Sequence, residues 1–332
     1  MDKSISLRMM FCNVICTFLV ILRHSLNLRA FFISETPANW NAIVQNGSMN
    51  ITSIAVPFFF LMSGFFFFKG VDATYKDTIN KIKRRCKTLL VPFLVWGAIN
   101  TIILQVSDSC RYGLWDGLLF THLWYVRDLL FFVLFTPFLA FLRNKATFIL
   151  YLVLIALAIL WQPVDSVFPS SEGMFFFTLG CTLRQNVLLR ITCHSSMAFL
   201  VMLWLIIPFV YPIGQTIVWQ KVYIFSGVLL LWILSQKMPQ DINRLIKTVA
   251  PYCFFIYCAH LYVLKAIKVT LASMFRNNDA ISLASFFLIP IIVTVLLLGI
   301  GVFLKKHCHT TFALLTGFRN LQYLKKNEST IL

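Results

Sequence analysis

A succession of long apolar runs is the feature of this 332-residue chain that most restricts its fold. The runs last about 17 to 25 residues, which at about 1.5 Å per residue is enough for an α-helix to cross a bilayer core. A transmembrane β-barrel would instead show short segments of alternating hydrophobicity. With 59% hydrophobic and only 12% charged residues, the chain has too few polar side chains to cover a soluble domain. The sequence therefore predicts an all-α, polytopic membrane helix bundle.

The apolar runs predict about ten transmembrane helices. Their ranges are 9–29, 51–68, 89–106, 118–142, 147–163, 172–183, 195–212, 217–236, 249–270 and 282–304, the sixth being the shortest. The first run is expected to remain in the protein as a helix, because Arg23 and His24 follow it directly and no small-residue cleavage site does.

The basic residues gather in alternate loops between these spans. Most of the 29 Lys and Arg residues fall in the loops that share a side with the N-terminus. The positive-inside rule then predicts that both termini are cytoplasmic and that the number of crossings is even. The same one-sided distribution argues against nucleic acid as the partner of a chain with net charge +17. Lys265 and Lys268 are exceptions, since they lie at the outer end of the ninth span.

Residues 1–304 are predicted to form one transmembrane domain, followed by a basic tail at 305–332. The tail mixes Lys and Arg with aromatic and aliphatic side chains, which favours a cytoplasmic amphipathic helix lying on anionic lipid. The nine cysteines show no CxxC pair and no metal-ligand spacing. They are expected to act as small buried hydrophobic residues, and no metal site is predicted.

Polar and titratable side chains within the apolar runs are the candidates for function, because each costs several kcal/mol in the bilayer unless it is paired or hydrated. Such residues occur in four places, namely Arg23 and His24 at the end of the first span, Ser63 and Gly64 in the second, His122, Arg127 and Asp128 in the outer half of the fourth, and His260 at the centre of the ninth. The groups in the first, fourth and ninth spans are expected to share the middle-to-outer part of the membrane and to line one cavity.

Structural explanations compete for several of these residues. Ser63 and Gly64 form a small-residue pair of the kind that lets helices approach closely. His122 begins a Leu-Trp-Tyr stretch of the kind found in an interfacial aromatic belt. Arg127 could simply neutralise Asp128, although adjacent helical residues point about 100° apart and are expected to pair poorly.

His24 in the first span and His260 in the ninth span are titratable groups with different expected roles. His260 can be a buried, hydrogen-bonded histidine or a catalytic or substrate-binding residue. His24 is a titratable base at the end of the first helix, and the ordinary histidine pKa near 6.5 suits proton abstraction at neutral pH.

Five segments around these residues resemble acyltransferase family 3, a family of bacterial multi-span membrane enzymes. In chain order they are Val20–Ser25, Ala55–Gly64, Lys81–Lys87 with the following Leu90–Phe93, His122–Tyr125 and Phe254–His260. The resemblance extends over nearly the whole chain, and the loop layout is most similar to the enterobacterial common antigen O-acetyltransferase type. It implies a multi-pass O-acyltransferase of the bacterial inner membrane that modifies envelope polysaccharide or a lipid-linked sugar.

The resemblance also implies roles for individual residues. Acyl-CoA, most often acetyl-CoA, would be a co-substrate presented from the cytoplasm, with no tightly bound cofactor. His24 would take the proton of the acceptor hydroxyl, and Arg127, Ser63 or Asn13 would donate hydrogen bonds to the developing oxyanion. The expected substrate-binding residues are Asn13, His122, Trp124, Tyr125, Asp128, His260, Lys81, Arg84, Arg85 and Lys87. The last four belong to the densest basic cluster of the chain. This cluster either binds a polyanionic CoA or serves only to set the topology.

One position departs from the family pattern. Asn13 stands where the family usually carries Arg, eleven residues before His24 and therefore about 16 Å away on the same helix face. Arg8 cannot replace it, because sixteen residues rotate a side chain about 160° away from His24. The loss of this charge puts the family's mode of donor binding in doubt.

Two other functions remain open at this stage. A transporter or flippase would also need many spans and intramembrane charges, but its sequence should show repeated halves or paired helix breaks, and neither is found. A catalytically inactive family member is favoured by Asn13 and disfavoured by the presence of His24, His122 and His260.

Overall fold

The computed structural model describes residues 3–36, 38–68, 75–107, 123–142, 147–161, 169–183, 197–211, 216–237 and 240–318. Within these ranges all regular structure is helical, which confirms the all-α prediction. The helices are α1 (Lys3–His24), α2 (Trp40–Thr52), α3 (Ala55–Phe68), α4 (Tyr75–Ser107), α6 (Trp124–Leu142), α7 (Thr147–Trp161), α8 (Ser171–Thr182), α10 (Met197–Val210), α11 (Ile217–Leu234), η2 (Ser235–Lys237), α12 (Gln240–Val249), η3 (Ala250–Tyr252), α13 (Cys253–Met274), α14 (Asp279–His307) and α15 (His309–Thr316).

Six helical segments of the described chain are long and apolar enough to cross a membrane. They are Ser4–His24, Trp40–Phe67, Lys76–Val106, Ile217–Leu234, Ile242–Met274 and Asp279–His307. The other four predicted spans correspond to α6, α7, α8 and α10. The polytopic membrane class is thus confirmed, whereas the total of ten crossings and the cytoplasmic position of both termini stay predictions.

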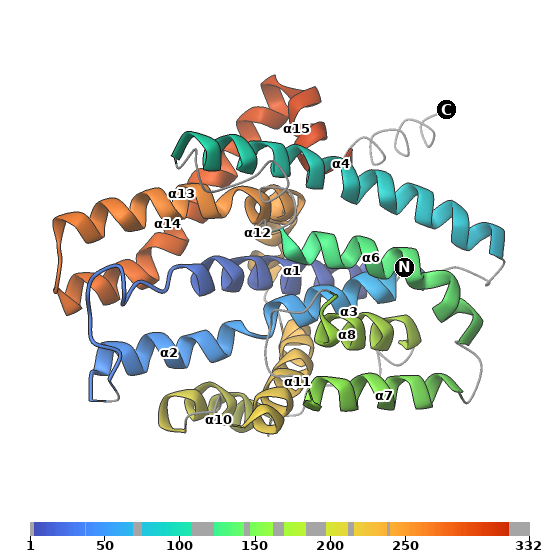
Figure 1. Ribbon diagram of the computed structural model, residues 1–332, viewed down its shortest axis with the longest axis horizontal. Coiled ribbons are helices and arrows are strands. Elements are labelled where there is room, and N and C mark those ends of the chain that lie inside the picture. Colours follow the sequence, from blue (N-terminus) through green and yellow to red (C-terminus); the bar gives the residue numbers. More distant parts are fainter. Residues whose placement is uncertain are drawn as a thin grey trace. The chain divides into compact units, whose positions relative to one another are not determined.

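The chain divides into two compact units. The first comprises residues 1–62 and 183–299, and the second comprises residues 63–182 and 300–332. The division falls within α3 and within α14. In the first unit α1 packs alongside α13 and also contacts α2 and α12, and in the second unit α4 packs against α6 and α15 (Figure 1).

Arg8 fastens the beginning of α1 to α11 and η2. Its Nε donates to Ser235 Oγ (3.0 Å) and its Nη2 to the carbonyl oxygen of Trp232 (2.9 Å). The guanidinium also lies 3.8 Å from the centre of the Trp232 ring, a cation–π contact. Arg8 is therefore fully engaged in helix packing, in agreement with its exclusion as a substitute for the missing arginine at position 13.

The first helix ends five residues before its predicted end at residue 29, and the backbone continues without regular structure. Backbone at membrane depth can leave the helix only where protein groups satisfy its polar atoms. Asn27 provides the first such point, because its Nδ2 donates to the carbonyl oxygen of Ser282 and to Ser285 Oγ, and its Oδ1 accepts from Gln45 Nε2 and Ser282 Oγ. All four side chains are buried. The hydropathy pattern could not reveal this network, since its members lie far apart in the sequence.

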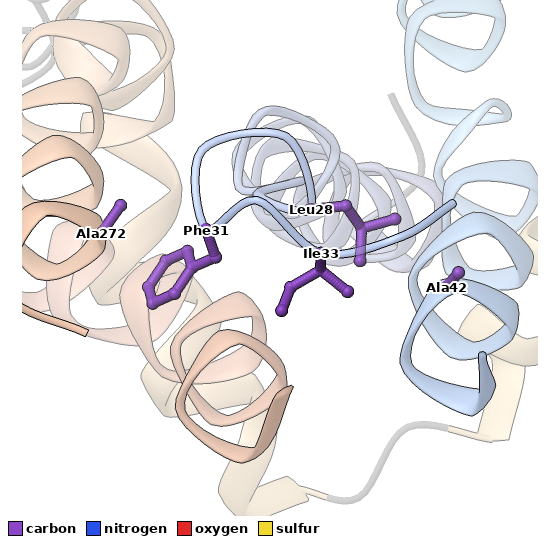
Figure 2. Close-up of a cluster of buried hydrophobic side chains, with 5 residues drawn as sticks. All are labelled: Leu28, Phe31, Ile33, Ala42 and Ala272. Atoms are coloured by element: carbon purple, nitrogen blue, oxygen red, sulfur yellow. The ribbon is translucent and has the colours of Figure 1, made fainter. Parts of the chain in front are cut away.

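Apolar contacts hold the same segment farther along. Leu28, Phe31 and Ile33 are buried between Ala42 on α2 and Ala272 on α13 (Figure 2). The segment after α1 is therefore a packed part of the first unit. Helix α2 itself lies in a stretch predicted as an outer loop, because its buried Asn, Gln and Ser residues make it too polar to resemble a span. The amphipathic α12 was likewise expected as an inner loop.

Close helix packing in the second unit depends on Gly64. A β-carbon at this position would collide with the carbonyl oxygen of Phe177 and approach the backbone nitrogen of Cys181 to 3.1 Å, both on α8. The absent side chain thus lets the backbones of α3 and α8 meet. This geometry supports the packing explanation for the small-residue pair in the second span.

The described part of the predicted tail contains the end of α14 and the short helix α15. Phe312 is buried and α15 packs on α4, where Trp96 Nε1 donates to the carbonyl oxygen of Leu315 (3.1 Å). Gly317 ends the helix with φ +71°, and a β-carbon there would collide with the carbonyl oxygen of Thr88. The face of α15 that carries Phe312 is therefore covered by protein, whereas Leu314 is exposed. Residues 319–332 lie outside the described chain.

Candidate active site

Two histidines from distant parts of the chain meet in the first unit. The ring of His24, at the end of α1, lies with its centroid 5.2 Å from that of His260 on α13, and the ring planes are inclined by 43°. His260 is 1% exposed, whereas His24 is half-buried. A half-buried imidazole can still be reached by a substrate hydroxyl. The structure thus brings together two of the residues that the sequence singled out, while their chemical roles stay predictions.

The hydrogen bond of His260 fixes its tautomer. Its Nδ1 lies 2.6 Å from the carbonyl oxygen of Tyr257. A carbonyl oxygen can only accept, so Nδ1 must carry the hydrogen and donate it. In the neutral ring Nε2 is then the basic nitrogen. The turn of α13 that begins at Tyr257 therefore orients the imidazole that lies against His24.

The position of His260 along α13 gives the depth of the pair. His260 lies fourteen residues before Met274, about 21 Å from that end of the helix. Because α13 is part of a membrane-spanning segment, the end of α1 lies beside the interior of this span. Helix α1 therefore places His24 at membrane depth. The chain leaves the helix at that depth and continues as a non-helical segment.

Asn13, the position at which the sequence departs from the family it resembles, is half-buried on α1. Its carbonyl oxygen accepts from Thr17 Oγ1 (2.8 Å). Within the same unbroken helix, Asn13 lies about 16 Å from His24, as the eleven-residue spacing predicts.

Ser63 and Tyr125 form a second polar contact, in the second unit. Ser63 Oγ and the Tyr125 hydroxyl are 3.1 Å apart, and Tyr125 also lies within electrostatic range of Arg85. One turn nearer to the start of α4, Lys81 Nζ donates to the carbonyl oxygen of Phe67 (2.6 Å). The end of α3 and the basic start of α4 are therefore antiparallel neighbours, with the start of α6 beside them.

The structure places Arg127 and Asp128 in the first two turns of α6, which packs against α4. Both were expected in the outer half of the membrane, and that depth stays a prediction. His122 lies outside the described residues, and Trp124 is exposed at the first turn of α6.

Helical geometry separates the basic cluster into two sets. Lys81 and Arg85, one turn apart on α4, are half-buried, whereas Lys83, Arg84 and Lys87 are exposed. The sequence pattern treated these residues as one patch. The structure shows that only the first two face the protein.

Arg127 and Asp128 pair directly, contrary to the expectation for adjacent helical residues. Arg127 Nε and Nη2 both lie 3.0 Å from Asp128 Oδ1. The long arginine side chain spans the angle of about 100° between neighbouring positions. Asp128 is 1% exposed, and its Oδ2 accepts from the backbone N–H of Ser170 (2.9 Å) at the start of α8. Arg127 therefore neutralises a buried carboxylate that anchors α8.

Sequence reasoning missed two residues that shape the histidine pair. Tyr257 supplies the carbonyl group that orients His260. Lys268, noted only as a charge at the end of a span, donates to the carbonyl oxygens of His24 (3.2 Å) and Leu26 (3.0 Å). A lysine two turns after His260 within an apolar run was the available signal. Among the described residues, no group of three or more His, Cys, Asp or Glu is placed to hold a metal ion.

Comparison with known proteins identifies the family. The family described as "Acyltransferase domain" matches residues 13–304, a range that contains both histidines and most of the chain. The chain belongs to acyltransferase family 3. The protein is therefore a membrane acyltransferase, and the resemblance inferred from five short segments is confirmed. Six described helical segments of this acyltransferase are long and apolar enough to cross a membrane.

A curated relative of this acyltransferase is the succinoglycan biosynthesis protein ExoH of Rhizobium meliloti (strain 1021). The two are 22% identical over 300 residues, which cover 80% of this chain and 79% of the relative. No solved structure matches this acyltransferase.

Proposed function

We propose that this protein is an O-acyltransferase of the bacterial inner membrane that moves an acyl group, most simply acetyl, from cytoplasmic acyl-CoA to a sugar hydroxyl of envelope polysaccharide or a lipid-linked sugar. The contact between His24 and His260 at membrane depth carries the proposal. Family membership supports acyl transfer, and the name of the relative, which refers to succinoglycan biosynthesis, supports a polysaccharide acceptor.

In the proposed reaction His24 is the general base. The acceptor hydroxyl oxygen attacks the thioester carbonyl carbon as His24 takes the hydroxyl proton. The tetrahedral intermediate then collapses, the carbon–sulfur bond breaks, and the sulfur leaves as the CoA thiol after receiving the proton from His24. The products are an O-acyl ester and CoA, and the enzyme returns to its starting state. His260, in ring contact with His24, supports the orientation of the base.

The half-buried Lys81 and Arg85 are the proposed contact for the anionic part of acyl-CoA. Both face the interior of the second unit, beside Ser63 and Tyr125. A cation that is partly removed from water binds phosphate more strongly than an exposed one, because water screens it less. The exposed Lys83, Arg84 and Lys87 then serve chiefly to hold this end of α4 on the cytoplasmic side.

Neutralising Arg85 should raise the KM for acyl-CoA, whereas neutralising its neighbour Arg84 should not. The expected increase for Arg85→Gln is about tenfold or more, because a charge-assisted hydrogen bond contributes about 1.5–3 kcal/mol. Arg84→Gln is the matched control, with the same chemical change at an exposed position. Steady-state kinetics at varied acyl-CoA would measure both. Equal KM values for the two variants would reduce the cluster to a topology signal.

Transfer of radiolabelled acetyl from acetyl-CoA tests the function itself. Purified protein in proteoliposomes would receive the donor together with lipid-linked sugar or polysaccharide from the native envelope. The proposed enzyme should place label on the acceptor, in a form that mild base releases as acetate. A transporter or flippase would move a substrate without attaching label, and an inactive family member would do neither. Absence of covalent label with every envelope fraction would reject the proposal.

A further inference from the structure

The C-terminal end of α1 needs hydrogen-bond donors that the helix itself cannot supply. The last four carbonyl groups of an α-helix have no partner within the helix, and a glycine that ends the helix often meets this need. No glycine follows His24. Instead, the Lys268 ammonium on α13 donates to the carbonyl oxygens of His24 and Leu26. Ser25 adds a hydroxyl donor, since its Oγ lies 2.7 Å from the carbonyl oxygen of Leu22 on α1 and 2.9 Å from that of Phe286 on α14.

The charge of Lys268 is unusual for its location. It is half-buried within a membrane-spanning segment, where a cation is costly and marks a functional position. Among the described residues no carboxylate is found within ion-pair distance of Lys268. Its counterpart is the negative end of the α1 dipole, which includes the His24 carbonyl group that it contacts.

Helix α13 therefore contacts the end of α1 at two levels. His260 lies against the ring of His24, and Lys268, about 12 Å farther along α13, binds the backbone of His24 itself. The polar network around Asn27 fixes the chain beyond this point. Lys268 is thus the group on α13 that fixes the main chain carrying the His24 side chain.

We propose that Lys268 is a positioning residue, which caps α1 and thereby holds the His24 imidazole against His260. This inference rests on the proposed function, in which His24 is the base. Lys268 acts through the main chain and is not expected to contact acyl-CoA or the acceptor. Its loss should therefore lower kcat and leave the KM for acyl-CoA unchanged, because the base is misplaced while the donor contacts remain.

Three variants test the inference in the full-length protein reconstituted in lipid nanodiscs. Lys268→Met keeps the length of the side chain and removes the donors. Lys268→Arg keeps the donors. Lys265→Met is the matched control, because Lys265 lies on the same helix and is exposed. Each variant would be measured by hydrogen–deuterium exchange of the amides from Ser25 to Phe31 and by steady-state acyl transfer.

Lys268→Met should exchange at least about tenfold faster at these amides and lose about 10- to 100-fold in kcat with unchanged KM. Lys268→Arg should restore both measurements to within a few-fold, and Lys265→Met should match the parent. Unchanged exchange in Lys268→Met overturns the inference, and so does faster exchange with an unchanged kcat. If the parent protein transfers no acyl group at all, the proposed function fails, and the positioning role is overturned with it even where exchange identifies a helix cap.

Discussion

His24→Ala is expected to lower kcat for acyl transfer by about 10²–10⁴-fold, the usual contribution of general base catalysis. The imidazole is half-buried at the end of α1 and stands against His260, so its removal eliminates the proposed proton acceptor without opening the helix core. Initial rates at saturating acyl-CoA and acceptor would measure the loss. The amount of inserted, detergent-extractable protein should be that of the parent.

Arg23→Ala is the matched control for this variant. Arg23 precedes His24, points about 100° away around the helix, and donates through Nη1 to the carbonyl oxygen of Met49 (3.1 Å). Its removal should therefore affect activity much less. His260→Ala and His122→Ala should each retain more activity than His24→Ala. Near-normal transfer by His24→Ala together with its loss in His260→Ala or His122→Ala would place the base on another helix.

Gly64→Ala should prevent accumulation of folded protein. The added β-carbon would overlap the carbonyl oxygen of Phe177, a backbone atom that cannot move unless α3 and α8 separate. Overpacking in a core commonly costs about 1–3 kcal/mol, and a backbone-to-backbone collision should exceed that range and consume much of the marginal stability of a protein. The measurement is the yield of monodisperse protein after mild detergent extraction, followed by thermal unfolding of whatever remains.

Gly299→Ala offers the comparison at a glycine of α14, where a β-carbon would meet nothing within 4 Å. The yield and unfolding temperature of this variant should equal those of the parent or rise slightly, because alanine favours helix over glycine by about 1 kcal/mol. Equal yields for Gly64→Ala and Gly299→Ala would show that α3 and α8 are not in backbone contact in the membrane.

The spans and the family could be predicted from the sequence because both depend on local information. A run such as 282–304 predicts a membrane helix from the hydrophobicity of its own side chains, whatever surrounds it. His24 became a candidate in the same way, since a titratable group at the end of an apolar helix is costly wherever that helix lies. The short segments that resemble acyltransferase family 3 are likewise contiguous in the chain, and the family match confirmed them.

Only the tertiary structure decided how these residues are used. The end of α1 at His24 depends on Asn27, Gln45 and Ser282, whose hydrogen bonds replace the next helical turn. The same network includes polar residues of α2, and these residues are the reason that the hydropathy pattern did not predict α2 as part of a span. The contact of His24 with His260 and the cap by Lys268 likewise require α13 to pack on α1.

The second unit shows the same contrast between what the sequence predicts and what the tertiary structure decides. The sequence placed Arg84 and Arg85 in one basic patch, and the face of α4 that packs on its neighbours separated them. The sequence also predicted that Arg127 and Asp128 pair poorly. In the structure they do pair, because the Asp128 carboxylate is buried against the backbone N–H of Ser170, next to the start of α8. Hydrophobicity is a property of each side chain, whereas a hydrogen bond, a ring contact or a cap is a property of two groups that the chain brings together, and for that reason only the folded protein determines it.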